Sequence, residues 1–145
     1  MLKSFFHTGF VVKDLETSVA FYRDVMGLNH EFSSERTGEF AERVVGFKNA
    51  HLRIAFLNME NGHHLELVQY IVPEGAQAKF ERNDLGASHL AFFVENMEEY
   101  HAAMSGRGLR FIGPPATLVE NGKVMRKAAY AQDPDGNWLE FVELF

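Results

Sequence analysis

The feature that most constrains the fold of this sequence is an internal repeat. His7 and His89 lie 82 residues apart. The same offset relates three further pairs: Phe10 and Phe92, Val12 and Val94, and Glu16 and Glu98. At the end of each half, LELV (65–68) matches LEFV (139–142). Repeated units usually need one another to bury their apolar faces. We therefore expect two halves with the same order of secondary structure.

The first half is predicted to be a strand, a helix and three more strands. Residues 5–12 have the composition of a strand, and residues 14–27 carry apolar side chains at helical spacing. Asp14 is suited to cap the start of this helix, and Gly27 is suited to end it. The remaining predicted strands are 28–36, a run from about 42 to 58 broken by a turn at KNA, and 63–71.

The second half repeats this order after a linker at about 72–86, which carries Pro, Gly and charges without alternation. A strand is predicted over 88–95 and a helix over 96–108, with Asn96 as its N-cap. The later predicted strands are 109–112, 116–119, 124–132 and 137–144, with a DPDG turn at 133–136 before the last. The expected fold class is therefore α+β, with two tandem βαβββ modules.

We place these modules at about 1–72 and 86–145, within a single domain of residues 1–145. The chain has 46% hydrophobic residues, which is enough for a buried core. Its net charge of −6 and its lack of a basic run exclude nucleic acid as an expected partner. It contains no apolar stretch of bilayer length and no signal-peptide pattern, so we expect a cytoplasmic protein that does not bind membranes. The absence of Cys excludes disulfides and thiolate ligands.

Alternation along the best-defined strands separates two sets of side chains. One set is uniformly apolar and suits a face packed against helices: Phe10, Val12, Leu65, Leu67, Leu90, Phe92, Val94, Leu139 and Phe141. The other set begins each strand with an ionisable residue: His7, Glu66, His89 and Glu140. It then becomes mostly apolar, with Val11, Val68, Tyr70 and Phe93 among its members. The repeat relates these positions, so we expect them to line one site.

Two imidazoles and two carboxylates form a suitable ligand set for a divalent cation such as Zn, Ni, Fe, Mn or Co. A metal would also explain Glu140, a carboxylate inside the apolar run WLEFV, because a buried charge is tolerated when it binds a cation. Taken singly, each His is more simply a surface residue and each Glu a solvent-facing one. Their matched positions in both halves favour a metal site, and His64, on the face of Glu66, is an alternative ligand.

The sequence resembles the vicinal oxygen chelate superfamily, which includes glyoxalase I, methylmalonyl-CoA epimerase, extradiol dioxygenases, and fosfomycin and bleomycin resistance proteins. The resemblance covers almost the whole chain. It rests on HTGFVVKDLETSVAFYRDVMGL, LELV, SHLAFFVENMEE and DPDGNWLEFVEL. It implies a cup-shaped, mostly antiparallel sheet with helices on its outer face and a metal inside. The ligands it implies are the residues already selected by alternation: His7, Glu66, His89 and Glu140.

The resemblance implies a metal-dependent lyase or isomerase of the glyoxalase type. Such an enzyme stabilises an enediolate or enolate of a small carbonyl or thioester substrate. Glu66 and Glu140 are the candidates for proton transfer. One alternative is an Fe(II) extradiol ring-cleavage dioxygenase, which needs two His and one carboxylate and can dispense with Glu66. A second is a non-catalytic, drug-binding resistance-type protein without metal. The resemblance also implies a homodimer.

The chain departs from glyoxalase I at two positions that engage glutathione in that enzyme. Glyoxalase I typically has Arg four residues after the first ligand and Asn four residues after the second, whereas this chain has Val11 and Tyr70. Together with Val68 and Phe93, these residues form the expected substrate pocket. Such a pocket is less polar than a glutathione site, and the sequence leaves the substrate open.

Overall fold

The computed structural model describes residues 1–60 and 62–145. These residues form two compact units, Met1–Gln77 and Ala78–Phe145. The boundary between the units lies inside the predicted linker, and residues 73–88 contain turns and extended chain without a helix or strand. The grouping of both modules into one domain stays a prediction.

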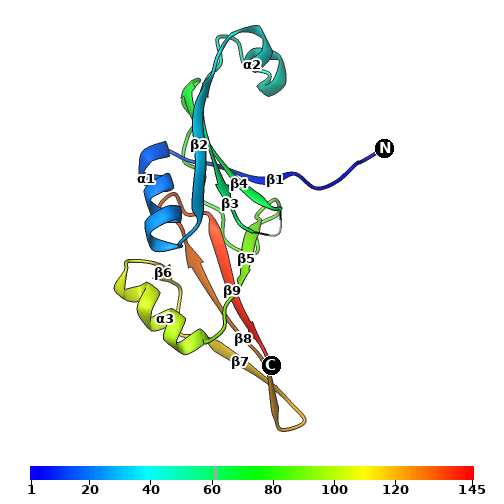
Figure 1. The fold of residues 1–145 in the computed structure, drawn as a ribbon, viewed down its shortest axis with the longest axis vertical. Coiled ribbons are helices and arrows are strands. Elements are labelled where there is room, and N and C mark those ends of the chain that lie inside the picture. Colours follow the sequence, from blue (N-terminus) through cyan, green and yellow to red (C-terminus); the bar gives the residue numbers. More distant parts are fainter. Residues whose placement is uncertain (61) are drawn as a thin grey trace. The chain divides into compact units, whose positions relative to one another are not determined.

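The first unit contains a four-stranded sheet in the order β1-β4-β3-β2 (Figure 1). Strand β1 runs parallel to β4, and the other two pairings are antiparallel. Its described elements are β1 (His7–Val11), α1 (Leu15–Ala20), the π-helix η1 (Phe21–Val25), β2 (Asn29–Arg36), α2 (Gly38–Val45), β3 (His51–Asn58) and β4 (His64–Val72).

The second unit repeats the parallel pairing, because β5 lies beside β9 in a sheet ordered β5-β9-β8-β6, with β7 paired to β8. Its described elements are β5 (His89–Phe93), α3 (Met97–Gly106), β6 (Arg110–Phe111), β7 (Ala116–Glu120), β8 (Lys123–Gln132) and β9 (Trp138–Leu144). The α+β class predicted from the sequence is confirmed. Among the described residues, no helix is long and apolar enough to cross a membrane.

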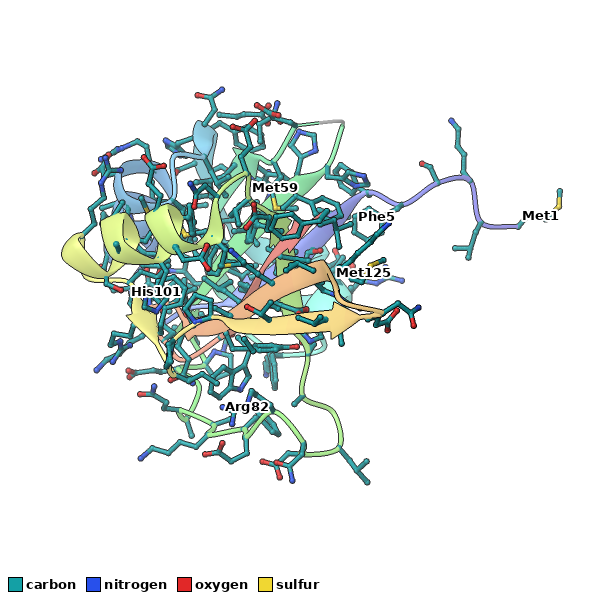
Figure 2. All side chains as sticks on the ribbon, turned by 90° about the horizontal axis from the view of Figure 1, so that it is seen from below. Met1, Phe5, Met59, Arg82, His101 and Met125 are labelled. Atoms are coloured by element: carbon teal, nitrogen blue, oxygen red, sulfur yellow. The ribbon has the colours of Figure 1, made fainter. Side chains whose placement is uncertain are left out.

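The first strand is shorter than the predicted run 5–12, because β1 begins at His7. Its only partner in the described part of the sheet is β4, which itself begins at His64, directly opposite His7. Phe5 and Phe6 therefore have no strand to pair with, and both side chains are largely exposed. Figure 2 shows Phe5 on the segment that leads out to Met1.

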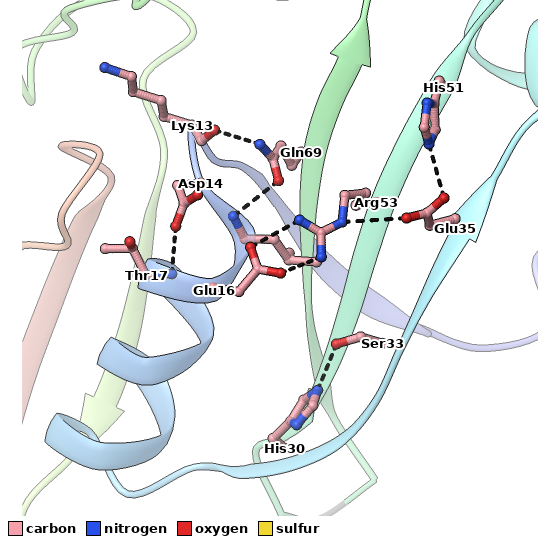
Figure 3. Close-up of polar contacts among 11 residues, drawn as sticks. Lys13, Asp14, Glu16, Thr17, His30, Ser33, Glu35, His51, Arg53 and Gln69 are labelled. Carbon is pink, nitrogen blue, oxygen red and sulfur yellow. Dashed lines mark hydrogen bonds and ion pairs between the residues drawn. The ribbon is translucent and has the colours of Figure 1, made fainter.

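The first helix starts where the sequence predicts. The carboxylate of Asp14 accepts a hydrogen bond of 2.8 Å from the backbone N–H of Thr17 (Figure 3). The side chain of Thr17 and this backbone bond lower the pKa of Asp14. The backbone N–H of Leu15 donates to the side chain of Gln69, which ties α1 to β4. Gly27 follows the helix with φ +80°. One detail differs, because residues 21–25 widen into the π-helix η1.

The strand predicted from about 42 to 58 is wrong over its first part, which is the end of helix α2. The helix turns one side inward: Ala41 is buried, and Val45, four residues on, packs against the β3 residues Leu52, Ile54 and Phe56. Gly46 ends the helix in a left-handed conformation with φ +77°. The apolar run VVGF resembles a strand locally, whereas the wider spacing of Ala41 and Val45 is helical.

Most of the apolar set that alternation selects is buried, whereas Leu90, Phe92 and Val94 of the second unit are partly buried. In the first unit, Leu65 and Leu67 of β4 are completely buried, and α1 packs on β3 and β4. In the second unit, Phe141 lies at the centre of an aromatic cluster. Its ring is 5.0 to 5.8 Å from the rings of Phe92, Tyr100 and Phe111. These contacts fix which face of each sheet remains for the site, because the next side chain along a strand points the opposite way.

The DPDG turn sets the alignment of β8 against β9. The completely buried carboxylate of Asp133 accepts hydrogen bonds from the backbone N–H groups of Asp135 and Asn137, at 3.0 and 2.8 Å, and from the Asn137 amide at 2.8 Å. With the turn closed in this way, Tyr130 lies opposite Glu140. A single buried side chain therefore determines which residue of β8 faces a predicted metal ligand.

Replacing Asp133 with Ala is expected to lower the free energy of unfolding by about 3 kcal/mol, because three partly buried donors lose their acceptor. The control is Asp24→Ala, which breaks an exposed ion pair with Arg23 and should leave stability nearly unchanged. Urea denaturation of both variants measures the difference. Equal stability of the two variants would contradict this role for Asp133.

Candidate metal centre

The first half of the predicted site is a His–Glu pair on the two parallel strands of the first unit. Gly9 of β1 lies opposite Glu66 of β4, and His7 stands two residues before Gly9 on the same face. The His7 Nε2 and Glu66 Oε2 atoms are 3.1 Å apart, and their side chains are 28% and 19% exposed. A Cβ atom at Gly9 would stand 3.6 Å from the same carboxylate oxygen. That distance is an ordinary van der Waals contact, so a small side chain would fit at this position.

The second half of the predicted site has the same construction in the second unit. Ala91 of β5 lies opposite Glu140 of β9, and His89 stands two residues before Ala91. The His89 Nε2 and Glu140 Oε2 atoms are 3.2 Å apart. The Glu140 side chain is 18% exposed, close to the value for Glu66. The repeat recognised in the sequence therefore places a His–Glu pair at equivalent positions of both sheets.

The spacing within each pair fits two ligands of one divalent ion. Imidazole and carboxylate ligands lie about 2.0–2.2 Å from Zn²⁺, which puts neighbouring ligand atoms about 2.8–3.6 Å apart for angles at the metal between about 90° and 110°. The measured nitrogen–oxygen separations of 3.1 and 3.2 Å are within this range. The same distances also suit a hydrogen bond between the two side chains. Each pair thus presents two candidate metal-ligand atoms, one nitrogen and one oxygen, close together.

Neither unit alone supplies a full set of ligands. Over residues 1–60 and 62–145, no group of three His, Cys, Asp or Glu side chains is placed to hold a metal ion. The structure brings His7 together with Glu66, and His89 together with Glu140. The joining of the two pairs around one ion remains a proposal. The Nδ1 atom of His7 is buried and has no hydrogen-bond partner, so the ring is held by packing and by its contact through Nε2.

An aromatic residue stands opposite each carboxylate, and the sequence analysis did not select either one. Phe56 of β3 faces Glu66, and its ring meets the His7 ring edge-on at 5.4 Å. Tyr130 of β8 faces Glu140, and its ring meets the His89 ring at the same distance. Counting outward from the predicted DPDG turn at 133–136 would have placed Leu139 opposite Tyr130. The loop is one residue longer, because Gln132 pairs with Trp138, and this shift brings Tyr130 opposite Glu140.

Tyr130 differs from Phe56 by its hydroxyl, and its side chain projects from the same face of the sheet as its register partner Glu140. Burial raises the pKa of Tyr130 above its ordinary value, and the negative charge of Glu140 raises it further. The phenol therefore stays protonated at neutral pH and can donate a hydrogen bond to a neighbouring carboxylate.

His64 lies beside His7 in the parallel ladder but faces a different carboxylate. Its Nε2 atom is 3.2 Å from Glu31 Oε2, and the other carboxylate oxygen of Glu31 accepts a hydrogen bond from Asn58. His64 is thus paired with Glu31, whereas Glu66 is paired with His7. This arrangement favours His7 over His64 as the ligand from the first unit.

Two further histidines of the first unit are engaged away from the pairs. His51 Nε2 is 3.1 Å from the Glu35 carboxylate, and His30 Nε2 is 2.9 Å from the Ser33 hydroxyl (Figure 3). Arg53 forms an ion pair with Glu16 of α1 and joins the same outer network. These contacts account for His30 and His51 without a metal.

The predicted pocket residues are divided between the two units. Val11 and Val68 are register partners in the first unit, and Tyr70 follows Val68 on the same face. The Tyr70 ring meets the Phe47 ring edge-on at 6.1 Å, so the end of α2 adds an aromatic side chain to this face. Phe93 belongs to the second unit, where it is 80% exposed. The first-unit residues therefore form an apolar strip that continues from Glu66.

Comparison with known proteins gives a family match over nearly the whole chain. The model of the family described as "Glyoxalase/Bleomycin resistance protein/Dioxygenase superfamily" matches residues 4–141. All four predicted ligands and both aromatic residues opposite the carboxylates lie inside the matched region.

Individual proteins agree with this match. A lactoylglutathione lyase of Haemophilus influenzae is 31% identical over 140 residues, covering 94% of this chain and 90% of its own. A 2-epi-5-epi-valiolone epimerase of Actinomyces sp. is 28% identical over 144 residues, covering 95% of this chain and 78% of its own. The crystal structure of a glyoxalase family protein from Bacillus cereus superposes with a TM-score of 0.85 at 24% identity, covering 100% of this chain and 96% of that one.

Proposed function

The chain belongs to the Glyoxalase/Bleomycin resistance protein/Dioxygenase superfamily, and within it we propose a divalent-metal-dependent lyase or isomerase acting on a small carbonyl or thioester compound. The observation that carries the proposal is the matched pair of contacts, His7 with Glu66 and His89 with Glu140. We propose that these four residues share one ion, with the pairs supplied by one chain or by two chains of a homodimer.

The presence of a carboxylate in both pairs favours this proposal over the two alternatives. A ring-cleaving dioxygenase would leave Glu66 without a ligand role, although Glu66 is as shielded as Glu140 and is paired in the same way. A drug-binding protein without metal does not need two partly buried carboxylates, because burying a charge without a cation is energetically unfavourable. The similarity to proteins named as a lyase and an epimerase supports the same choice.

A bound divalent ion would supply Lewis-acid stabilisation of the negative charge that develops on a substrate oxygen. The protein holds the imidazole nitrogens and carboxylate oxygens that would bind the ion in fixed orientations. Each imidazole presents Nε2 to the site, and the edge-on rings of Phe56 and Tyr130 pack against the imidazoles of His7 and His89. The largely shielded carboxylates meet little competing water, which strengthens their interactions with charge.

The carboxylates Glu66 and Glu140 are the proposed groups for proton transfer. One of them takes a proton from the carbon next to the substrate carbonyl at a carboxylate oxygen, and then returns it to the same or the adjacent carbon. Epimerisation needs a proton delivered to the opposite face of the same carbon, which the second carboxylate in its protonated form would donate. Return of the removed proton to the adjacent carbon, with a proton moving between the two substrate oxygens, gives isomerisation. No oxidant or second substrate is needed for either outcome.

The substrate proposed here lacks a glutathione moiety. Val11 is 62% exposed on the face beside Glu66 and has no polar atom to hold a peptide-like group. Tyr70 packs against Phe47 and the apolar residues of β3. This strip suits the hydrocarbon part of a small substrate, with its oxygen atoms directed toward the His–Glu pairs.

Metal binding is expected to depend on both modules. His7→Ala and His89→Ala should each lower the amount of Ni²⁺ or Zn²⁺ retained after desalting by at least about tenfold, because each removes a ligand. His64→Ala is the matched control, since His64 lies beside His7 in the ladder and faces Glu31. Elemental analysis of protein purified without chelator and then reloaded provides the measurement. Equal metal content in all three variants would rule out the proposed ligand set.

Turnover is expected to depend on one carboxylate more than on the other. Glu66→Gln and Glu140→Gln keep the side-chain size, and the variant that lacks the base should lose about 10²–10⁴-fold in rate. Deuterium incorporation next to the carbonyl can be followed by NMR with a panel of 2-hydroxy ketones, 2-hydroxy aldehydes and thioesters. Metal content is measured on the same samples to separate ligand loss from base loss. Full exchange activity in both variants would refute the proton-transfer role.

A further inference from the structure

The two modules are alike around their His–Glu pairs except for one hydroxyl group. In the first unit, Phe56 lies opposite Glu66 and its ring packs edge-on against His7 at 5.4 Å. In the second unit, Tyr130 lies opposite Glu140 and its ring packs against His89 at 5.4 Å. Position, strand and ring packing are therefore equivalent, and only Tyr130 can donate a hydrogen bond.

Tyr130 lies against both members of its pair. Its ring contacts the His89 imidazole, and its side chain stands on the same face of the sheet as Glu140, directly opposite it in the register of β8 and β9. Glu140 itself lies 3.2 Å from His89, so the three side chains are neighbours. Glu66 has the corresponding contact with His7, and Phe56 opposite it offers only a hydrocarbon edge.

We propose that Tyr130 is a positioning residue that holds the carboxylate of Glu140 in one orientation and so makes the two module carboxylates unequal. Glu140 is the restrained carboxylate, and Glu66 keeps more freedom to rotate. The consequence for metal binding rests on the proposed function, whereas the proposed hydrogen bond from Tyr130 to Glu140 needs no metal.

The physical basis is the cost of ordering a long side chain. A Glu side chain loses up to about 1.5–2 kcal/mol of rotational freedom when it is fixed in one orientation. A hydrogen bond that fixes it beforehand removes part of this cost from ligand binding, and losing such an outer contact typically weakens metal affinity about 10–100-fold. Glu140 is only 18% exposed, so water competes weakly for the phenol donor.

The first experiment uses protein without metal and measures the contact itself. Tyr130→Phe, Glu140→Ala and the double variant form a cycle in urea denaturation, and Glu140→Gln serves in place of Glu140→Ala if the latter does not fold. A hydrogen bond to a charged group predicts that the two substitutions are coupled by at least about fivefold in the unfolding equilibrium constant. Additive effects would overturn the proposal.

The second experiment measures Ni²⁺ affinity by competition with a chromogenic chelator. Tyr130→Phe should weaken binding by about tenfold or more, and this loss should disappear when Glu140 is already Ala. The matched variant is Phe56→Tyr, which gives the first module the hydroxyl of the second, and it should not weaken binding. An affinity for Tyr130→Phe within twofold of the unaltered protein would overturn the proposal.

The two experiments separate failure of this proposal from failure of the proposed function. If the unaltered protein binds no Ni²⁺ or Zn²⁺, the metal-dependent function is refuted, and the urea cycle still decides whether Tyr130 holds Glu140. If the unaltered protein binds metal, and Tyr130→Phe shows neither coupling in the urea cycle nor weaker Ni²⁺ binding, only the positioning role is refuted. A coupled cycle together with weakened, Glu140-dependent metal binding supports both.

Discussion

The parallel pairing of the first and last strand of each module is the constraint on which the candidate site depends. A parallel ladder between β1 and β4 places the start of one strand beside the start of the other, so that His7 meets Glu66. The ladder between β5 and β9 does the same for His89 and Glu140. Parallel neighbours need a crossover connection, and each module makes that crossover with a helix and further strands. The order of elements in a module and the meeting of His with Glu therefore have one cause.

A carboxylate that is largely shielded from water needs polar partners that offset its lost hydration. The two modules differ in the partners that they offer. Glu66 has the imidazole of His7, whereas Glu140 has the imidazole of His89 and, in our proposal, the hydroxyl of its register partner Tyr130. Duplication produced two equivalent pairs, and the difference at residues 56 and 130 separates their properties. An enzyme that needs one firm ligand and one movable base would benefit from such a difference.

The sequence predicted the candidate ligands where the alternation of residues along the strands and the internal repeat pointed to the same positions. His7 and His89 could be matched by their offset, and parity placed them on the face of Glu66 and Glu140 without knowledge of strand pairing. The strand order required the structure, because parity does not say which strands are neighbours. Tyr130 was missed for this reason: its importance comes from the alignment of β8 with β9, which the buried Asp133 sets.

Helix α2 was missed for a different reason. Its residues VV, followed by Gly46 and Phe47, have the local composition of a strand, and the helical signal consists of little more than Ala41 and Val45. The helix depends on tertiary packing of Val45 against β3, which outweighs local propensity. The second module has only a two-residue turn at 121–122 between the corresponding strands β7 and β8. Comparison of the two halves therefore does not predict an inserted helix.

The central claim is that the four ligand residues, two from each module, share one ion. X-ray absorption spectroscopy of the Ni²⁺-loaded protein, combined with metal counting, tests this claim most directly. The account predicts one ion per chain, with two imidazole nitrogens and carboxylate oxygens in its coordination shell. Two ions per chain with a single imidazole each would show that the pairs act separately. That result, or a shell without imidazole, would contradict the account.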